Sequence, residues 1–314
     1  MEFGVSLANV AGYPAPVDRC LEIAQSLDAL GFDSVWVHDH VARPVAMPDG
    51  HDGVSSPYEP LMLVSALASL TQRIQIGTLA LTLPLRHPAI TAKMLAAADL
   101  LSGGRIVLGV GVGSAFEEFE ALNLPNALFE RRVEATDEYL RAIKEMWTST
   151  GPSNFTGEFV AFRDVGAFPK PAHKPHPPVM VAGDSPEAMV LASRQADIYL
   201  APFVPPAEFA AHVREFHDIC RRDRRDPAEV PVSMLAPVVF TEAPQHGERA
   251  SLTGTPEQLW QDLRLYGRAG LDHLIMVPGM AGETSAGSSA VRAIELFAAE
   301  ILPAFHHSRT HNHA

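Results

Sequence analysis

Long runs of positive charge are missing from this sequence. The 314 residues carry a formal net charge of −13, and no run of Lys or Arg is longer than two residues. Binding to a nucleic-acid backbone depends on clustered cations, so we expect no nucleic-acid partner. A phosphorylated small ligand is not excluded, because backbone N–H groups at the start of a helix can bind phosphate without net positive charge.

Cysteine and long apolar runs are also scarce. The two cysteines, Cys20 and Cys220, fall in segments that we predict to be helical, which excludes a disulfide-rich secreted scaffold. No apolar run approaches the ~20 residues of a membrane-spanning helix, and the first residues carry no export signal. We therefore expect a cytoplasmic protein without a membrane partner.

The apolar runs that are present are short and alternate with longer amphipathic segments, which is typical of repeated β-α units around a parallel sheet. The predicted strands are residues 3–7, 34–38, 74–79, 106–109, 179–182, 198–201, 233–239 and 273–277. The predicted helices are residues 17–30, 60–70, 88–101, 128–148, 186–195, 206–222, 256–269 and 286–302. Eight of each predicts an α/β fold of the (β/α)8 TIM-barrel type. A doubly wound open sheet also alternates strands and helices and is the alternative.

Two stretches interrupt this alternation. Residues 44–57 form a polar, glycine-containing segment after the second strand, and we expect a loop over the barrel mouth. Residues 151–178 combine a hairpin-like stretch with a proline-rich crossing, which predicts an insertion after the fourth β-α unit. We expect one domain over residues 1–305 and a disordered, His-rich tail over 306–314.

The end of the second strand carries the densest group of reactive side chains, His38, Asp39 and His40. Active sites of α/β barrels lie at the C-terminal ends of the strands, so these residues are candidates for chemistry. A helix cap with surface polar residues is one alternative. A metal site is another, since His38 and His40 lie on one side of a strand. Such a site needs further ligands after later strands, where the sequence has Ala182-Gly183 and Val277-Pro278, so we predict no metal.

Three further strand ends offer small residues or a helix start. After the third strand the chain stays extended through Thr82. This segment is either an irregular end of the strand or a surface against which a flat ligand lies. The fourth strand leads into Gly111 and Gly113, where the backbone can approach a ligand closely. The fifth leads into Gly183 and Asp184 before a capped helix start, which suits a phosphate although the carboxylate of Asp184 opposes one.

Taken together, these motifs resemble the luciferase-like monooxygenase superfamily, which comprises flavin- or deazaflavin-dependent barrels. The resemblance extends to about Phe305. It rests on residues 31–37 running into Asp39-His40, 76–78, 105–113, 117–119 and 175–179. The Asp-His pair is similar to the branch that uses the deazaflavin coenzyme F420. The branch that uses flavin mononucleotide (FMN) often has Glu-His at this place.

The resemblance implies a role for each strand end. It implies a non-prolyl cis peptide at Leu79–Ala80 behind the cofactor ring, and His40 as the proton donor or acceptor. The implied catalytic residues are Asp39 and His40, and the implied cofactor-binding residues are Asp39, His40, Leu79, Ala80, Thr82, Gly111, Gly113, Ala182, Gly183 and Asp184. The implied chemistry is transfer of a hydride between F420 and a small organic substrate.

Several expectations about the substrate and partners follow. The substrate pocket is expected to include His51, Ser114, Phe116 and Phe203. Sugar-phosphate dehydrogenases of the F420 branch carry a glutamate where this chain has Ser114, so glucose-6-phosphate oxidation is not implied. The resemblance also implies a homodimer.

The alternatives are an FMN-dependent monooxygenase supplied by a separate reductase, and a metal-dependent hydrolase that uses His38 and His40. A barrel that binds a cofactor without catalysis is a further alternative.

Overall fold

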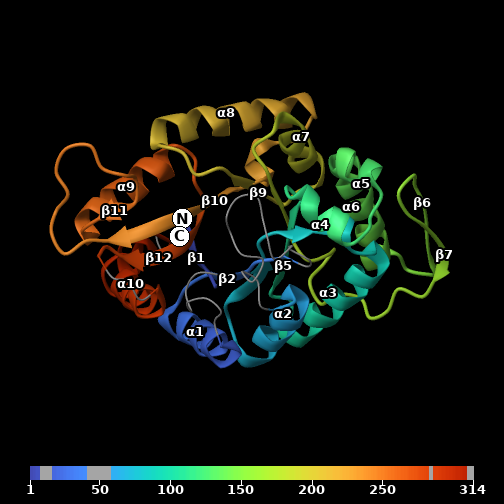
Figure 1. Ribbon diagram of the computed structural model, residues 1–314, viewed down its shortest axis with the longest axis horizontal. Helices are drawn as coiled ribbons and strands as arrows, with labels where there is room; N and C mark the ends of the chain where they lie inside the picture. Colours follow the sequence, from blue (N-terminus) through green and yellow to red (C-terminus); the bar gives the residue numbers. More distant parts are fainter. Residues whose placement is uncertain (8–15, 41–57, 283–285, 310–314) are drawn as a thin grey trace. The chain divides into compact units, whose positions relative to one another are not determined.

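The computed structural model describes residues 1–7, 16–40, 58–282 and 286–309. The chain divides into two compact units, of which the first comprises Met1–Trp36 with Leu200–Ala314 and the second comprises Val37–Tyr199. In each unit, helices alternate along the chain with parallel strands (Figure 1).

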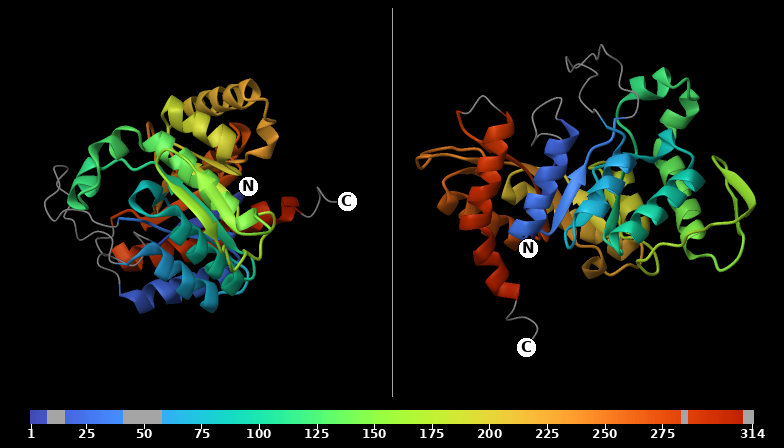
Figure 2. Two further views of the ribbon diagram at one scale, coloured as in Figure 1. Left: turned by 90° about the vertical axis from the view of Figure 1, so that its right-hand side faces the viewer. Right: turned by 90° about the horizontal axis from the view of Figure 1, so that it is seen from below.

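The first unit contains a parallel sheet in the order β11-β10-β12-β1-β2. Its strands are β1 (Glu2–Ser6), β2 (Ser34–Val37), β10 (Val232–Phe240), β11 (Thr253–Gly254) and β12 (His273–Met280). Its helices are α1 (Val17–Leu30), α8 (Pro206–Arg222), α9 (Pro256–Arg268), α10 (Ala286–Glu300) and α11 (Leu302–Arg309), with a short 3-10 turn at Pro227–Glu229. Helices α1 and α10 lie side by side (Figure 2). Phe297 of α10 packs on Phe3 of β1 with ring centroids 5.1 Å apart.

A buried polar cluster joins the strand starts of this first unit. The indole N–H of Trp36 donates to the Ser34 hydroxyl, which lies 2.8 Å from His273 Nε2, and Ser233 contacts the other ring nitrogen. A Cβ atom at Gly4 would come within 2.2 Å of Ser34 Oγ, so only glycine fits there. The N-terminal ends of barrel strands generally serve stability, and we assign this cluster to the fold.

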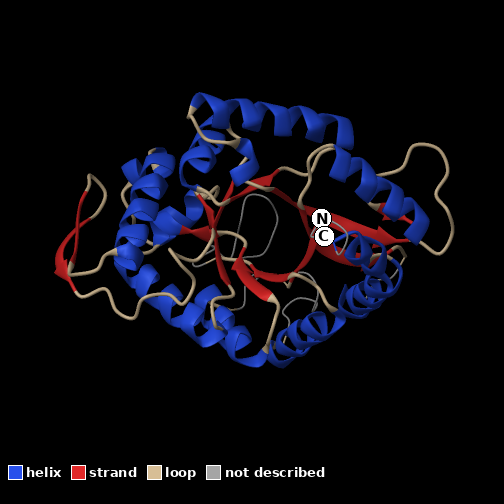
Figure 3. Ribbon diagram, turned by 180° about the vertical axis from the view of Figure 1, so that it is seen from behind, coloured by secondary structure: helices blue, strands red, loops and turns tan. Residues whose placement is uncertain are grey.

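The second unit contains the parallel order β3-β5-β8, with β4 paired to β5. Its strands are β3 (Gln75–Thr78), β4 (Leu81–Thr82), β5 (Ile106–Gly111) and β8 (Val179–Ala182), with an antiparallel hairpin of β6 (Ser153–Thr156) and β7 (Ala161–Val165). Its helices are α2 (Pro60–Leu70), α3 (Pro88–Ser102), α4 (Phe116–Ala121), α5 (Asn126–Glu130), α6 (Arg132–Thr148) and α7 (Pro186–Gln195), with a 3-10 turn at Leu83–Leu85. Strand β9 (Ile198–Ala201) contains the boundary between the units. Figure 3 shows the helices of each unit outside its strands.

All eight predicted strands and all eight predicted helical segments are present, in the chain order of a (β/α)8 barrel. Local signals fix several boundaries: Gly31 ends α1 in the left-handed conformation, Ser185 caps α7, and Thr255 opens α9 with a capping box. The insertion after the fourth β-α unit contains the expected hairpin. The loop expected over the barrel mouth, residues 44–57, lies outside the described residues.

Four details differ from the predictions. The helix predicted over 128–148 is two helices, because Arg131 leaves helical geometry between α5 and α6. The third strand resumes as β4 after an irregular step. Strand β12 continues to Met280, because Pro278 and Gly279 pair with β10. Helix α11 reaches Arg309, so residues 306–309 of the expected tail are helical. Phe305 packs on Phe3 and anchors this helix.

Candidate active site

The candidate site lies in the second unit, at the C-terminal ends of its parallel strands. The ends of neighbouring parallel strands share one edge of a sheet, so residues that follow β3, β5 and β8 come together there. Small, half-buried residues follow these strands, namely Ala80, Gly111, Gly113, Ala182 and Gly183. Half-buried backbone with small side chains leaves room for a flat ligand.

Asp39 is held by three donors within this unit. Arg86 donates from Nη1 to Oδ2 at 2.6 Å and from Nη2 to Oδ1 at 2.8 Å, in a bidentate pair. The backbone N–H of Thr82 donates to Oδ2 at 2.9 Å. The Asp39 side chain is fully buried, so this carboxylate joins the end of β2 to β4. These bonds hold the Asp39 carboxylate in place, and its catalytic role and its contact with a cofactor both stay predictions.

Arg86 extends the same cluster to the start of α2. Its Nη2 also donates to Glu59 Oε1 at 3.1 Å, while the other oxygen of Glu59 caps α2 by accepting from the N–H of Met62. Burial alone lowers the pKa of Arg86, but hydrogen bonds and charges from Asp39 and Glu59 outweigh it, and the net shift is upward. Arg86 therefore stays charged, and it ties Asp39 to the α2 cap.

His40 is paired with a buried carboxylate from a distant part of the chain. Its Nδ1 lies 3.0 Å from Oε1 of Glu118 on α4. The side chain of His40 is 36% exposed and that of Glu118 is 5% exposed. His40 is therefore accessible from the solvent side, while its partner is enclosed by the protein.

His38 is held as a neutral base. Burial, and to a lesser degree the nearby charge of His40, lowers the pKa of His38 to about 4. Among the described residues, no group of three or more His, Cys, Asp or Glu side chains is placed to hold a metal ion. The described part of the chain thus lacks the ligand set that the hydrolase alternative requires.

The step between β3 and β4 carries the predicted cis peptide bond, at Leu79–Ala80. The N–H of Leu79 donates to the Val37 carbonyl at 2.7 Å, and the Thr78 hydroxyl donates to the Gly109 carbonyl at 2.7 Å. A Cβ atom at Gly109 would come within 1.8 Å of the Thr78 carbonyl oxygen. The close approach of β3 to β5 therefore depends on glycine at this position.

The two glycines after β5 differ in their surroundings. At Gly111 the Ala80 Cβ, 3.4 Å away, is the only described atom within 4 Å of an added Cβ. Gly113 has φ of +87°, and an added Cβ would come within 2.9 Å of Thr82 and 3.0 Å of Phe119. Gly111 therefore presents a free surface, whereas Gly113 turns the chain from β5 toward α4.

The start of α7 follows β8 directly. Gly183 has φ of +150° and its carbonyl accepts from the Tyr199 hydroxyl at 2.9 Å, while Asp184 is exposed. Ser185 Oγ accepts from the N–H of Ala188, so part of the first turn is already capped. Ala182, Gly183 and Asp184 lie at a helix start as predicted, and their contact with a phosphate stays a prediction.

The residues expected in the substrate pocket are not all brought together. Ser114 is exposed and Phe116 is half-buried, and both follow β5. Phe116 packs edge to face on Phe129, with ring centroids 5.2 Å apart. Phe203 belongs to the first unit and is 37% exposed. His51 lies outside the described residues.

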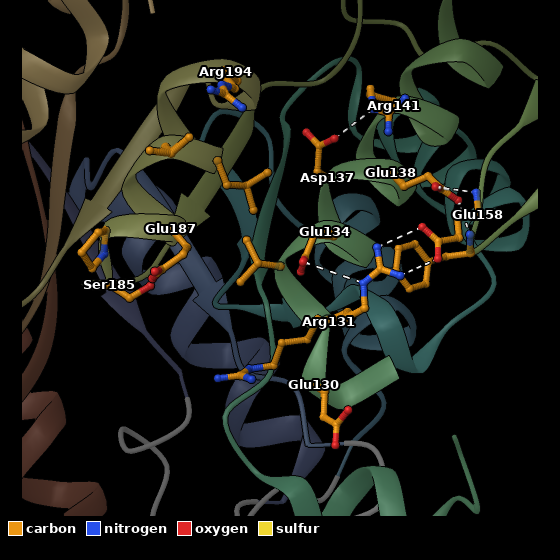
Figure 4. Close-up of a pocket in the computed structure, with 16 residues that line it drawn as sticks. Glu130, Arg131, Glu134, Asp137, Glu138, Arg141, Glu158, Ser185, Glu187 and Arg194 are labelled. Carbon is orange, nitrogen blue, oxygen red and sulfur yellow. Dashed lines mark hydrogen bonds and ion pairs between the residues drawn. The ribbon is translucent and has the colours of Figure 1, made fainter. Parts of the chain in front are cut away.

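A cleft of about 890 Å³ in the second unit lies between α6, α7 and the β6–β7 hairpin, and it reaches the start of α7 at Ser185. Figure 4 shows that two of its arginines are paired: Arg131 contacts Glu134 and Glu158, and Arg141 contacts Asp137. Six acidic side chains and four arginines line it. An excess of carboxylates does not suit an anion, so we assign no phosphate to this cleft.

Two members of the site were not assigned from the sequence. Arg86 follows the third strand among prolines, and Glu118 stands in a short acidic segment, so neither pattern indicates its partner. They lie 47 and 78 residues from the side chains that they contact. Glu118 lies in the 117–119 motif of the resemblance, which implied no role for it, and Arg86 offered no signal beyond its place near a strand end.

Comparison with known proteins identifies the family. Residues 1–273 match the family described as luciferase-like monooxygenase. The chain belongs to this family. This is the family that the motifs at the strand ends indicated.

The curated relatives of this luciferase-like chain include both F420-dependent and FMNH(2)-dependent enzymes. An F420-dependent glucose-6-phosphate dehydrogenase of Amycolatopsis mediterranei is 33% identical over 60% of this chain and 56% of its own. An FMNH(2)-dependent dimethylsulfone monooxygenase of Pseudomonas putida is 31% identical over 58% of this chain and 48% of its own. In both cases the matched part spans about half the length of the relative.

A solved structure shows the fold. The coenzyme F420-dependent tetrahydromethanopterin reductase of Methanopyrus kandleri superposes with a TM-score of 0.76 at 18% identity, covering 97% of this chain and 99% of its own. The fold of this luciferase-like chain is the (β/α)8 TIM barrel, as predicted, and the doubly wound alternative is excluded. None of the described helices is long and apolar enough to cross a membrane.

Proposed function

We propose that this chain is a coenzyme F420-dependent oxidoreductase that transfers a hydride between the deazaflavin and a small organic substrate. One observation carries the proposal: an accessible imidazole, held by a buried carboxylate, stands at the end of β2 in the unit whose β3, β5 and β8 end in small residues. The F420-dependent relative at 33% identity supports the same cofactor. The Asp39-His40 pair, which is typical of the F420 branch, supports it further.

The residues at the strand ends fit a flat cofactor. Among the described residues, an added Cβ at Gly111 would meet nothing closer than Ala80 at 3.4 Å, so the described surroundings leave this backbone open to a ring. Ala80, Gly111 and the turn at Gly113 would hold the ring, and Gly183 with the start of α7 would hold the phosphate. When bound, F420 supplies a ring carbon that accepts or gives a hydride.

The protein's own groups supply the proton and the orientation. If the substrate is an alcohol, its carbon loses a hydride and its hydroxyl loses a proton as the C=O bond forms. His40 is accessible, and its imidazole can accept or donate that proton. Asp39, locked to Arg86 and the Thr82 N–H, keeps the end of β2 in place beside it.

The residues that follow β5 indicate a chemical class of substrate and not a single compound. Ser114 stands where sugar-phosphate dehydrogenases of the F420 branch carry glutamate, and the nearby Phe116 is apolar and half-buried. We therefore propose an uncharged organic substrate, and we do not propose glucose 6-phosphate.

The second candidate is an FMN-dependent monooxygenase that receives reduced flavin from a separate reductase and uses oxygen. The FMNH(2)-dependent relative at 31% identity supports it. The same strand ends would hold the flavin ring, so the cofactor itself decides between the two proposals.

Titration of the purified protein separates these candidates. F420 and FMN are added in turn and binding is followed by fluorescence. We expect saturable binding of F420, and weaker binding in a Gly111→Leu variant whose side chain fills the open backbone. A Gly151→Leu variant, changed at an open position away from the site, should bind like the wild type. Binding of FMN alone would overturn the F420 assignment.

We also propose that two copies of this chain pair through α2 and α3. These helices pack against each other, and α2 contains no charged residue. Along α3, Ile90, Met94, Ala97 and Leu101 follow one another at helical spacing, and all four are exposed or half-buried. An apolar face without charge suits an identical face, as in a two-fold symmetric dimer.

A further inference from the structure

Glu118 is a buried acidic residue in the candidate site whose role the cofactor proposal does not explain. Its side chain is 5% exposed and lies 3.0 Å from His40 Nδ1. Buried carboxylates are costly unless they are hydrogen-bonded, so this contact is part of what makes the position acceptable.

Packing of the neighbouring residue, Phe119, holds Glu118 in place. Phe119 is 1% exposed and lies edge to face on Phe129, with ring centroids 5.2 Å apart. Phe119 also lies against Gly113, which could not carry a side chain there. The short helix α4 is thus fixed to the end of β5, and the Glu118 carboxylate is held at a defined distance from β2.

The pairing determines which ring nitrogen of His40 carries a proton. An ionised carboxylate accepts hydrogen bonds and cannot donate them, so Nδ1 must be the donor. The remaining nitrogen, Nε2, is then a free acceptor in the neutral ring and a donor in the charged ring. Asp39 cannot take this role, because Arg86 and the Thr82 N–H occupy its two oxygens.

We propose that Glu118 is the positioning residue for His40, fixing the tautomer with the proton on Nδ1 so that Nε2 exchanges the substrate proton. This inference rests on the proposed function. In alcohol oxidation the hydroxyl proton passes to Nε2, and the two electrons leave the carbon as a hydride to the oxidised deazaflavin. The resulting imidazolium lies beside the Glu118 carboxylate, which stabilises it. In the reverse direction the same nitrogen returns the proton.

The first test needs neither cofactor nor substrate. Nitrogen NMR of the imidazole rings distinguishes the two tautomers, and comparison with a His40→Ala variant assigns the His40 signals. We expect the Nδ1–H tautomer in the wild type, loss of that preference in Glu118→Leu, which has no acceptor, and its retention in Glu118→Gln, whose amide oxygen still accepts. Glu120→Leu, at an exposed position on the same helix, serves as the control. Unchanged His40 signals in Glu118→Leu would overturn the inference.

The second test measures the consequence for turnover. A series of small primary and secondary alcohols is screened with F420, and the best substrate is used for all variants. Removing the partner that orients a metal-bound imidazole typically costs about 10- to 100-fold. We expect a fall in kcat of the same order in Glu118→Leu, which removes the acceptor, while the Kd of F420 is kept. Equal losses in kcat and in F420 binding would make Glu118 a structural residue and overturn the inference.

The outcomes separate this inference from the proposed function. If the wild type binds no F420 or oxidises no alcohol, the proposed function fails, while the ring-nitrogen signals still decide whether Glu118 sets the tautomer of His40. If F420 binds and turns over but the tautomer ignores Glu118, only the positioning role fails.

Discussion

Each buried carboxylate in the described parts of the candidate site has specific donors. Asp39 accepts from Arg86 and from the Thr82 N–H, and Glu118 faces His40. A single charge left in such a place is expensive, because desolvation is not compensated. The side chains that partner these carboxylates are therefore the positions where single substitutions should have large effects.

Arg86→Met tests this for Asp39. The change leaves a fully buried carboxylate with only the Thr82 N–H, and removing one partner of a buried pair typically costs about 3–5 kcal/mol. Urea denaturation measures the loss in the free energy of unfolding. Adding Asp39→Asn should recover part of it, because no uncompensated charge remains.

Arg131→Met is the matched control for Arg86→Met. Arg131 pairs with Glu158 at the surface, so its loss should destabilise the protein far less. If both substitutions lowered the free energy of unfolding equally, the buried Arg86–Asp39 pair would contribute no more to stability than a surface ion pair.

His38 predicts a pH dependence of stability. Its pKa is lowered to about 4 in the folded protein, against about 6.5 for an unperturbed histidine. Between these values the unfolded chain binds the proton and the folded protein does not, so stability is full above pH 6.5 and falls as the pH drops toward 4. At pH 5 the loss should be about 2 kcal/mol.

Urea denaturation at pH 7 and pH 5 measures this loss. His38→Asn should flatten the difference between the two pH values, whereas His246→Gln, at an exposed histidine, should leave it unchanged. An unchanged pH dependence in His38→Asn would refute the assignment.

At the scale of elements, the sequence indicated most of the fold because the decisive signals are local. Apolar runs and capping residues such as Ser185 and Thr255 set strands and helix starts almost to the residue. The break at Arg131 was missed, since an arginine within a helical pattern gives no local stop signal. Strand β12 was cut short because Pro278 usually ends a strand.

The candidate site was likewise predicted only in part from the sequence. Its strand-end residues were predicted, because in a barrel the position of a residue at a strand end already places it at the mouth. The pairings of Arg86 with Asp39 and of Glu118 with His40 were not, because they depend on where separate helices and turns pack. Long-range partners of this kind leave no spacing pattern in a single sequence.

The β6–β7 hairpin offers a test of one such long-range partner. Glu138 of α6 accepts from three backbone N–H groups of the hairpin, those of Glu158, Phe159 and Val160, at 2.7–2.8 Å. Gly157 must be glycine, because an added Cβ would come within 2.2 Å of the Glu138 carboxyl carbon. This carboxylate attaches the hairpin tip to the helix.

Glu138→Gln should release that tip. An amide side chain has one acceptor oxygen, and hydrogen bonds to charged groups contribute about 1.5–3 kcal/mol each. Hydrogen exchange should show lost protection at residues 158–160, with the core strands unchanged. Glu145→Gln, further along α6, is the control, and equal protection of the tip in both variants would contradict this role.

At the scale of the whole molecule, the negative net charge opposes the association of two copies, whereas the apolar surfaces of α2 and α3 favour it. A net charge of −13 disfavours close approach of two copies in general, because like charges repel. The uncharged surface of α2 and the apolar face of α3 are where that repulsion is weakest and where burial of apolar area contributes most. Any pairing of two copies should therefore use this face and should become stronger as salt screens the charges.

Ile90→Glu combined with Leu101→Glu tests the pairing directly. Both side chains are at least 60% exposed, so the substitutions should leave the folded chain intact while placing two carboxylates in the proposed interface. Sedimentation should show a dimer for the wild type and a monomer for the double variant at the same concentration. Leu265→Glu, an exposed leucine on α9, should stay dimeric, because it changes charge and apolar area away from α2 and α3. A wild-type monomer at high salt would refute the dimer, and a dimer that survives both glutamates would place the interface on another face.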